Sequence, residues 1–177
     1  MTTFLGRLTG AALLQPAIYE EVESDRTATM QAMAVVALSS LAAGVGALGP
    51  SGARLPALAG LSVLAFAGWG IWALLTLQIG TRWLPGPRTQ ADAGQLLRTI
   101  GFATAPGILR VAGVIPGAGA VVFGLTAVWM LAAMIVAVRQ ALDYTSTARA
   151  FAVCGIGWAL SLGLVFAIGS FCSPPLH

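Results

Sequence analysis

Five long apolar stretches, separated by short polar or turn-forming segments, dominate the pattern of hydrophobic positions along the chain. Each stretch approaches the roughly 20 residues that an α-helix needs to cross about 30 Å of hydrocarbon. The five run over Met30–Leu48, Leu58–Gly80, Leu96–Gly117, Ala120–Gln140 and Phe151–Cys172. The pattern therefore predicts an all-α integral membrane protein, in which residues 1–177 form a single domain built as a five-helix transmembrane bundle.

The third stretch is less regular than the others, because charged residues and prolines interrupt it. These residues are Arg98, Pro106, Arg110 and Pro116. Since proline removes a backbone donor and disturbs the preceding turn, we expect either a kinked span or one that is partly unwound against its neighbours. In the loop before it, Thr89 followed by Asp92 is typical of a capping box that starts a helix.

The segment before the first span, residues 1–29, has an amphipathic start and an acidic end. Apolar residues recur there at helical spacing up to Pro16: Phe4, Leu5, Leu8, Ala11 and Ala12. This spacing predicts a short interfacial helix on the inner leaflet. Residues 19–25, Tyr-Glu-Glu-Val-Glu-Ser-Asp, then hold four of the six acidic residues in the chain. Carboxylates are thus concentrated just before the first span.

The composition favours a membrane environment and excludes an ordinary soluble domain. Hydrophobic residues make up 58% of the chain, charged residues 8%, and the mean hydropathy is +0.88, whereas roughly a quarter of the residues in soluble proteins are charged. The nine basic residues are all arginine and lie scattered between the apolar stretches, without the basic block that binds nucleic acid. We therefore expect membrane lipids as partners, and no nucleic acid.

The distribution of arginine predicts an orientation in the inner (plasma) membrane. With the N-terminus in the cytoplasm, seven arginines are cytoplasmic: Arg7, Arg26, Arg82, Arg88, Arg98, Arg139 and Arg149. Only Arg54 and Arg110 then fall on or toward the outer side, in agreement with the excess of basic residues in cytoplasmic loops. Five spans place the C-terminus outside, and the same topology makes all six acidic residues cytoplasmic.

Several short pieces of sequence occur in an order that resembles a known family. They are Arg7, Pro16, Tyr19-Glu20-Glu21-Val22-Glu23, Gly101-Phe102-Ala103-Thr104-Ala105-Pro106, Ile115-Pro116-Gly117, Trp129 and Ala137-Val138-Arg139-Gln140-Ala141-Leu142-Asp143. In this order the chain resembles the bacterial branch of the Yip-domain family, multispan membrane proteins named for eukaryotic relatives that interact with Ypt/Rab-type small GTPases. The resemblance implies a cytoplasmic N-terminus and a multispan domain. The long polar N-terminal region of the eukaryotic members is absent here, so only the fold and topology are expected to transfer.

Charged and aromatic residues near the predicted cytoplasmic face form the first candidate site. They are Tyr19, Glu20, Glu21, Glu23, Arg98, Arg139, Asp143 and Arg149. Two interpretations are open: the acidic run binds a cationic partner beside the anionic inner leaflet, or it folds back onto the arginines as an internal charge cluster. Arg139 and Asp143 are four residues apart and can pair on one helix. Tyr19, Trp83 and Tyr144 are predicted to join an aromatic belt at the interface.

Pro106 and Arg110, in the third stretch, form a second candidate within the membrane. Arg110 lies twelve residues beyond Arg98, which is about 18 Å along a helix and past the middle of the hydrocarbon. An ionisable residue at that depth is either a functional group or an anchor that reaches the outer interface. Because no carboxylate is predicted on that side, we expect its partner to be backbone carbonyls, a lipid phosphate or another protein.

The sequence shows no catalytic or metal-binding constellation. Its single histidine is the last residue, its two cysteines are far apart, and its hydroxyl residues have no neighbouring base, so we expect no enzyme activity, cofactor or metal. The predicted function is to bind or organise a membrane protein partner through the cytoplasmic acidic and arginine face. Two alternatives remain, a small-molecule or ion transporter using the Pro-interrupted third span and an accessory subunit of a larger membrane complex. A homo-oligomer is also compatible with the sequence.

Overall fold

The structure is a computed structural model that describes residues 2–48, 55–86, 89 and 91–172, with side chains described for residues 2–47, 60, 63, 66–86, 89, 91–157 and 159–160. This part of the chain is all-helical and contains no strand. Its elements are α1 (Phe4–Ala12), α2 (Pro16–Ser24), α3 (Ala28–Leu48), α4 (Leu55–Gln78), the π-helix η2 (Ile79–Trp83), α5 (Ala93–Phe102), the 3₁₀-helix η3 (Ala105–Val114), α6 (Gly119–Ala141) and α7 (Thr147–Cys172).

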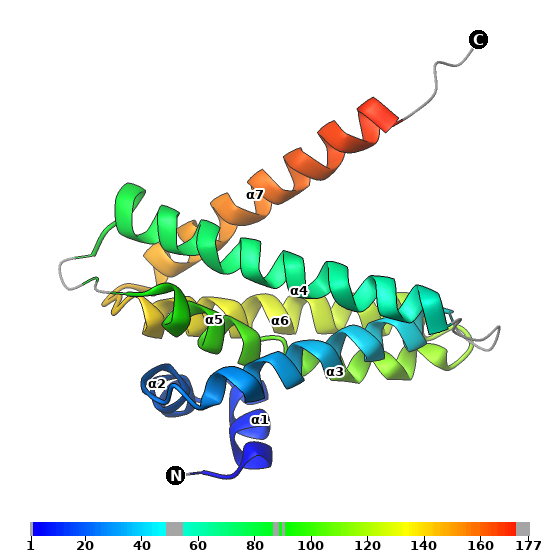
Figure 1. Cartoon of the computed structure of the whole chain (residues 1–177), viewed down its shortest axis with the longest axis horizontal. Helices are drawn as coiled ribbons and strands as arrows, with labels where there is room; N and C mark the ends of the chain where they lie inside the picture. Colours follow the sequence, from blue (N-terminus) through cyan, green and yellow to red (C-terminus); the bar gives the residue numbers. More distant parts are fainter. Residues whose placement is uncertain (1, 49–54, 87–88, 90, 173–177) are drawn as a thin grey trace.

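Three long helices, α3, α4 and α6, run along the long axis of the molecule, and η3 packs against α3 and α6 (Figure 1). The chain brings α2, the start of α5 and the end of α6 to one end of this bundle (Figure 1). We call it the charged end, because it holds Glu20, Glu21, Glu23, Asp25, Asp92 and Asp143. The opposite, far end holds the turn between η3 and α6. From the charged end, α7 leaves the bundle at an angle to α4.

The helices that can cross a membrane are fewer than the sequence pattern predicts. Within the described residues, two helices are long and apolar enough by length and composition: Ala28–Ala47, with a mean hydropathy of 1.6, and Gly119–Ala141, with 2.5. Among the described side chains, α7 contributes a shorter apolar segment, Thr147–Gly157. The prediction of a five-helix transmembrane bundle is therefore wrong, and the outer location of the C-terminus, which depended on five crossings, no longer follows.

The third predicted span is two short helices instead of one long one. α5 ends at Phe102, the Thr104 hydroxyl donates to the Gly101 carbonyl at 2.7 Å, and η3 begins with Pro106 in its first turn. Proline lacks the N–H that would continue α5, but it fits the start of a new helix. A ten-residue α-helix is about 15 Å long, roughly half of the hydrocarbon thickness. The helix is therefore interrupted between Phe102 and Ala105.

The N-terminal segment folds as two helices, of which the sequence pattern predicted one. α1 forms near the predicted place, where the Thr3 hydroxyl accepts from the Gly6 amide at 3.2 Å. A second helix, α2, begins at Pro16 and buries Ile18, Tyr19 and Val22, which are three and four residues apart on one face. This face packs with parts of α1, α3 and α5 into one hydrophobic cluster. The segment is therefore a packed layer on the bundle.

Two tyrosines that were predicted to lie in an aromatic belt are buried instead. Tyr19 is completely buried, and its hydroxyl donates to the Ala11 carbonyl at 2.9 Å. The Tyr144 hydroxyl, also buried, lies 3.0 Å from the Gly80 oxygen and 2.7 Å from the Leu84 oxygen. Each tyrosine thus satisfies carbonyls at the end of a neighbouring helix, as buried phenols require.

The capping box of α5 lies three residues later than predicted. The Asp92 carboxylate accepts from the Gln95 amide at 2.8 Å, and the Gln95 side chain accepts from the Asp92 amide at 2.7 Å. Thr89 instead lies in the preceding loop, where its hydroxyl is 3.0 Å from the Leu142 carbonyl oxygen. The threonine therefore joins this loop to the end of α6.

At the far end, α3 and η3 are in backbone contact. A Cβ atom added to Gly46 would lie 1.9 Å from the carbonyl oxygen of Arg110, and one added to Gly113 would lie 3.0 Å from the Gly46 oxygen. A Cβ on Gly107 would lie 2.1 Å from the Ser39 hydroxyl oxygen. A side chain does not fit where the two helices approach this closely, so glycine is favoured at these positions. These contacts fix the position of Arg110 relative to α3.

Candidate functional site

At the charged end, the first charge cluster is centred on Arg7 of α1. Its guanidinium is 2% exposed and lies 2.9 Å from a Glu21 carboxylate oxygen and 2.8 Å from an Asp25 oxygen. A third acceptor, the Gln31 side-chain oxygen, lies at 3.1 Å. Since Gln31 is on α3, this one arginine connects α1, the end of α2 and α3. The charges of Glu21 and Asp25 are thus used inside the protein.

The two carboxylates bound to Arg7 are held in their ionised form. Hydrogen bonds from Thr2 and then from Arg7 lower the pKa of Glu21 to about 2. Hydrogen bonds from Thr27 and then from Arg7 lower the pKa of Asp25 to about 2. Donors that bind only the charged form of a carboxylate have this effect. The cluster is therefore fully ionised at neutral pH.

Arg98 and Gln95 attach the end of α2 to α5. The Arg98 guanidinium is buried and donates to the backbone carbonyls of Val22, at 3.0 Å, and Glu23. These carbonyls belong to the last turn of α2, where a cation is favourable because the helix leaves its final carbonyls unpaired. The Gln95 amide donates to the Glu23 carboxylate at 3.1 Å. Arg98 therefore binds the acidic segment through its backbone.

Between α2 and the end of α6 lies a small cavity of about 260 Å³, which we call the charged groove. It is lined by Glu20, Glu23, Arg139, Gln140, Asp143, Tyr144 and Thr145. The Gln140 amide donates to the Glu20 carboxylate at 2.7 Å. The ion pairs of the described residues both involve Arg7, so the three carboxylates of the groove have no ion-paired cation in this part of the chain.

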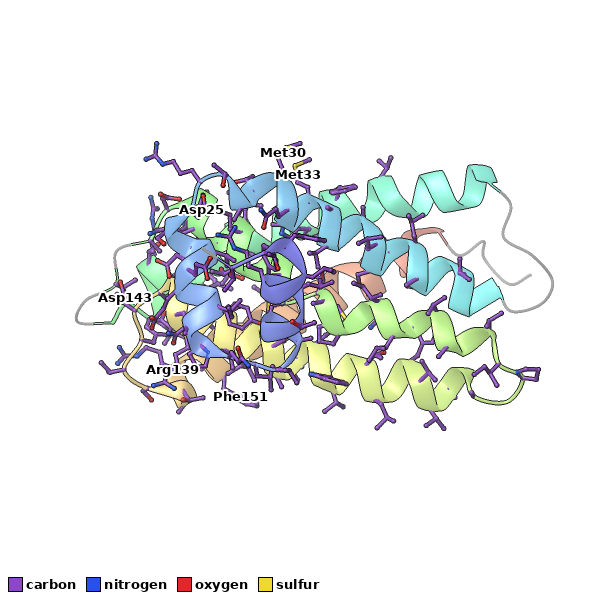
Figure 2. All side chains as sticks on the ribbon, turned by 90° about the horizontal axis from the view of Figure 1, so that it is seen from below. Asp25, Met30, Met33, Arg139, Asp143 and Phe151 are labelled. Carbon is purple, nitrogen blue, oxygen red and sulfur yellow. The ribbon has the colours of Figure 1, made fainter. Side chains whose placement is uncertain are left out.

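The predicted pair between Arg139 and Asp143 is not formed, although both lie at the charged end (Figure 2). α6 ends at Ala141, and Asp143 has a positive φ of 49°, so the two residues are not on one continuous helix. Arg139 instead approaches the Tyr144 carbonyl at 3.4 Å. Asp143 is exposed and directs no side-chain bond to the described residues. The broken helix thus leaves this carboxylate available.

Arg149 is separate from the acidic run. Its guanidinium donates to the Pro85 carbonyl at 3.2 Å and lies 5.7 Å from the centre of the Tyr144 ring. It therefore holds the loop after η2 against the start of α7 and does not neutralise the carboxylates of α2. Of the residues predicted for the charged cluster, the groove brings together Glu20, Glu23, Arg139 and Asp143.

Glu23 differs from its neighbours in the acidic run. Burial is the largest cause that raises its pKa, to about 7, and repulsion by Asp143 adds to it, while Arg98 opposes the shift. The side chain is half-buried and receives one hydrogen bond, from Gln95. The raised pKa means that Glu23 changes its charge near neutral pH, and the net charge of the groove changes with it.

The second candidate residue, Arg110, lies on η3 and lines a larger cavity of about 650 Å³. Its guanidinium Nε donates to the Thr126 hydroxyl at 3.2 Å and its carbon lies 5.4 Å from the centre of the Phe123 ring. Pro106, buried, has a local role at the start of η3. The expected carbonyl partners of the Arg110 guanidinium do not occur among the described residues. Arg54, the other arginine predicted on the outer side, lies outside the described residues.

Sequence reasoning missed two features of these sites. The first is the pairing of Arg7 with the acidic run. Arg7 is the only charged residue among the first 19, and this isolated cation, so close in sequence to residues 19–25, could have indicated the pairing. The second feature is the buried indole N–H of Trp72 on α4, which has no hydrogen-bond partner in the described structure. No sequence pattern indicated it, because the burial of this group depends on the packing of α4. In the described chain, no group of three or more histidine, cysteine or acidic residues could hold a metal ion. No family model, curated protein or solved structure matches the chain.

Proposed function

We propose that the chain is a non-enzymatic inner-membrane protein that crosses the bilayer through α3 and α6 and binds a protein partner at the charged groove. The observation that supports the membrane location is the exposure of the apolar helix α6. The Gly119–Ala141 helix has a mean hydropathy of 2.5, yet only 22% of its apolar 18-residue window is buried within the protein. The core helix of a soluble protein would be mostly buried, because exposed apolar surface is unfavourable in water.

Single side chains along the middle of the bundle agree with this proposal. Large apolar residues are exposed on three helices: Leu38 and Leu41 of α3, Ile71 and Leu74 of α4, and Val121, Leu125 and Val128 of α6. Val128 is 70% exposed. Polar groups gather at the charged end instead. This separation of apolar side surface and polar end is expected for a helix bundle in a bilayer.

The charged end is proposed to face the cytoplasm. Arg7, Arg26, Arg82, Arg98, Arg139 and Arg149 belong to segments at this end, whereas Arg110 lies on η3, nearer the far end. An excess of arginine marks the cytoplasmic side. α3 then crosses outward from residue 28, α4 leads the chain back to the charged end, α5 and η3 lead it again to the far end, and α6 returns to residue 141, so the N-terminus is cytoplasmic.

A test of this orientation uses single cysteines at exposed positions of opposite ends. Pro116 and Ser146 are both exposed, and each is replaced by cysteine in a chain that lacks Cys154 and Cys172. In spheroplasts, a membrane-impermeant thiol reagent should label the Pro116→Cys variant and should label Ser146→Cys only after lysis. Equal labelling of both variants before lysis would contradict a crossing by α6.

The groove supports a basic segment of a protein as the partner. Glu20 and Asp143 are exposed carboxylates that no described cation pairs with, and Arg139 is the one cation in the groove. An excess of carboxylates attracts Lys or Arg side chains and sets the orientation of the partner. The resemblance to the Yip-domain family remains a prediction that agrees with a partner-binding role, and it identifies no partner.

A photo-crosslinking amino acid at Thr145, which is exposed in the groove, tests this proposal. We expect one dominant crosslinked protein, and we expect Asp143→Asn to reduce it. The matched control is Asp92→Asn, which removes the same charge outside the groove and retains the helix cap, because asparagine caps as well as aspartate. Equal crosslinking yields for the unsubstituted chain, Asp143→Asn and Asp92→Asn would exclude the groove carboxylates as the binding surface.

A further inference from the structure

The larger cavity lies between α3, α4, α6 and the break between α5 and η3. Its volume of about 650 Å³ is within the range of sites that hold small organic ligands. Most of its wall is apolar, from Ala43, Trp69, Phe123, Met130 and Met134. A long apolar ligand would therefore be in contact with side chains along most of its length.

The charge in this wall comes from Arg110. A guanidinium has five N–H donors, and in the described structure Nε alone has a hydrogen-bond acceptor, the Thr126 hydroxyl at 3.2 Å. The ring of Phe123 supports the cation from one side at 5.4 Å. The described ion pairs both lie at the charged end, on Arg7. A ligand with an anionic group would thus supply acceptors to the Nη donors, and it would neutralise a half-buried charge.

A second group in the same wall also has no acceptor within the described chain. The indole N–H of Trp72 is buried without a hydrogen-bond partner. The neighbouring Trp69, in contrast, donates to the Leu97 carbonyl at 3.0 Å. Buried indole donors are normally paired, so an oxygen atom of a bound molecule is the expected partner of Trp72.

Two of the three hydroxyl groups of the wall do not require a ligand. Ser40 donates to the Val36 carbonyl at 2.7 Å, and Thr104 donates to the Gly101 carbonyl at 2.7 Å. Their hydrogen atoms are used within their own segments, so the donors left for a ligand are those of Arg110 and Trp72 and the hydroxyl of Ser39, which lines the same wall. Donors without opposing carboxylates select an acceptor-rich anion and disfavour a cation.

We infer that this cavity binds a single-chain amphiphile with an anionic head group, a fatty acid or a lysophospholipid. The acidic group lies on the Arg110 guanidinium, and the chain follows the apolar wall of α3, α4 and α6. A membrane lipid is the source that this geometry favours, because the cavity lies between the two helices proposed to cross the bilayer and its wall is mostly apolar. This site is separate from the charged groove.

The experiment uses the full chain, purified in a nonionic detergent, and palmitic acid brominated on its chain as the probe. Bromine quenches tryptophan fluorescence on contact, and Trp69 and Trp72 both line the cavity. We expect saturable quenching by the acid. The alcohol of the same chain length and bromination should bind at least about tenfold more weakly, because it lacks the charge-assisted bonds to Arg110. This comparison uses the natural chain alone, and equal affinity for the acid and the alcohol would overturn the inference.

Variants then test the role of Arg110. Arg110→Leu should weaken binding of the acid about tenfold or more and leave binding of the alcohol unchanged, while Arg110→Lys, which keeps the cation, should retain most of the affinity. Arg82→Leu is the matched control, since Arg82 is exposed near the charged end and its loss changes the net charge equally. If Arg110→Leu binds the acid as well as the natural chain does, Arg110 is not the head-group site.

Competition distinguishes the source of the anion. Lysophosphatidic acid and unbrominated palmitate should each displace the probe, and the stronger competitor identifies phosphate or carboxylate as the preferred group. Acetate and inorganic phosphate should not displace the probe at millimolar concentration, because they bury no apolar chain. Displacement by these small anions would overturn the lipid assignment in favour of a free anion. Each of these results is independent of whether a protein binds the charged groove.

Discussion

The two ends of the bundle use arginine in opposite ways. At the charged end, Arg7 is 2% exposed and is bound by two carboxylates and a glutamine, and the buried Arg98 is bound by backbone carbonyls. Arg110, nearer the far end, is half-buried, and its one described hydrogen bond is to a hydroxyl. Burial alone therefore does not show how an arginine is used. The number of bonded nitrogens differs among these three: Arg7 uses all three guanidinium nitrogens, Arg98 uses two, and Arg110 uses Nε alone, which leaves both of its Nη groups for a ligand.

The contacts that hold each end together also differ. At the charged end, side-chain hydrogen bonds connect elements far apart in sequence, such as Gln95 with Glu23 and Gln140 with Glu20. At the far end, α3 and η3 are joined through the close backbone approach at Gly46 and Gly113. Polar contacts of the first kind depend on pH, whereas backbone contacts of the second kind depend on side-chain volume. Each end can therefore be disturbed separately.

The largest effect is expected from Gly46→Ala. The added Cβ would lie 1.9 Å from the Arg110 carbonyl oxygen, and neither backbone can move without separating η3 from α3, so we expect a loss of about 3 kcal/mol or more in the free energy of unfolding. Gly124→Ala on α6 is the matched control, because no atom lies within 4 Å of its Cβ position. Thermal unfolding measured by circular dichroism would show the difference. Equal stability of the two variants would mean that η3 is not in contact with α3 at Gly46.

A smaller loss of stability is expected from Arg7→Leu. The substitution leaves Glu21 and Asp25 without their cation and removes the connection to Gln31, so we expect the midpoint of thermal unfolding to fall by about 5–10 °C. Arg26→Leu is the control, because Arg26 is exposed next to the same segment. A fall of similar size in both variants would indicate a general effect of charge and not the loss of this cluster.

The pH dependence of stability should come from the charged end. Between about pH 2 and pH 4.5 stability should rise with pH, because the lowered pKa values of Glu21 and Asp25 mean that the unfolded chain binds more protons. Between about pH 4.5 and pH 7 it should fall, because the pKa of Glu23 is raised to about 7 and the folded chain then binds more protons. Maximum stability is therefore expected near pH 4.5–5.

Glu23→Gln tests the second part of this profile. Glutamine cannot ionise, so the variant should lose the decline between pH 4.5 and pH 7 and should unfold roughly 2–4 °C higher than the natural chain at pH 7.5, a modest effect because the side chain is half-exposed and screened by solvent. The rise below pH 4.5 should remain. An unchanged profile above pH 4.5 would show that Glu23 ionises without cost.

The sequence predicted the helical class because long apolar periodicity reflects the helix itself, and it located α3 and α6 to within two residues at each end. It could not decide between a kinked and an unwound third stretch. That choice depends on contacts of η3 with α3, through Gly46 and Ser39, which lie more than 60 residues earlier in the chain. Hydropathy measures how apolar such a stretch is, but it does not detect the helix break at Thr104 and Pro106.

The candidate residues were predicted by charge and position, but their partners were not. The pairing of Arg139 with Asp143 assumed a continuous helix, and α6 ends between them, at Ala141. Helix α2 was missed because its acidic residues mask the buried face formed by Ile18, Tyr19 and Val22. In both cases the outcome was determined by packing of segments far apart in sequence, to which local propensity and spacing are insensitive.

The smallest effect on stability is expected from Arg110→Leu, and this is the strongest test of the contrast between the two ends. The substitution loses one hydrogen bond to Thr126 and the contact with Phe123, but it also removes a half-buried charge that has no described anionic partner, so the two changes should nearly offset each other. We expect the midpoint of thermal unfolding to stay within about 2 °C of that of the natural chain in lipid-free detergent. Addition of palmitate should then raise the midpoint of the natural chain but not that of the variant, because a ligand stabilises only the folded state that binds it. A loss as large as that of Arg7→Leu would instead show that Arg110 holds the fold, and that both ends use their arginines for structure.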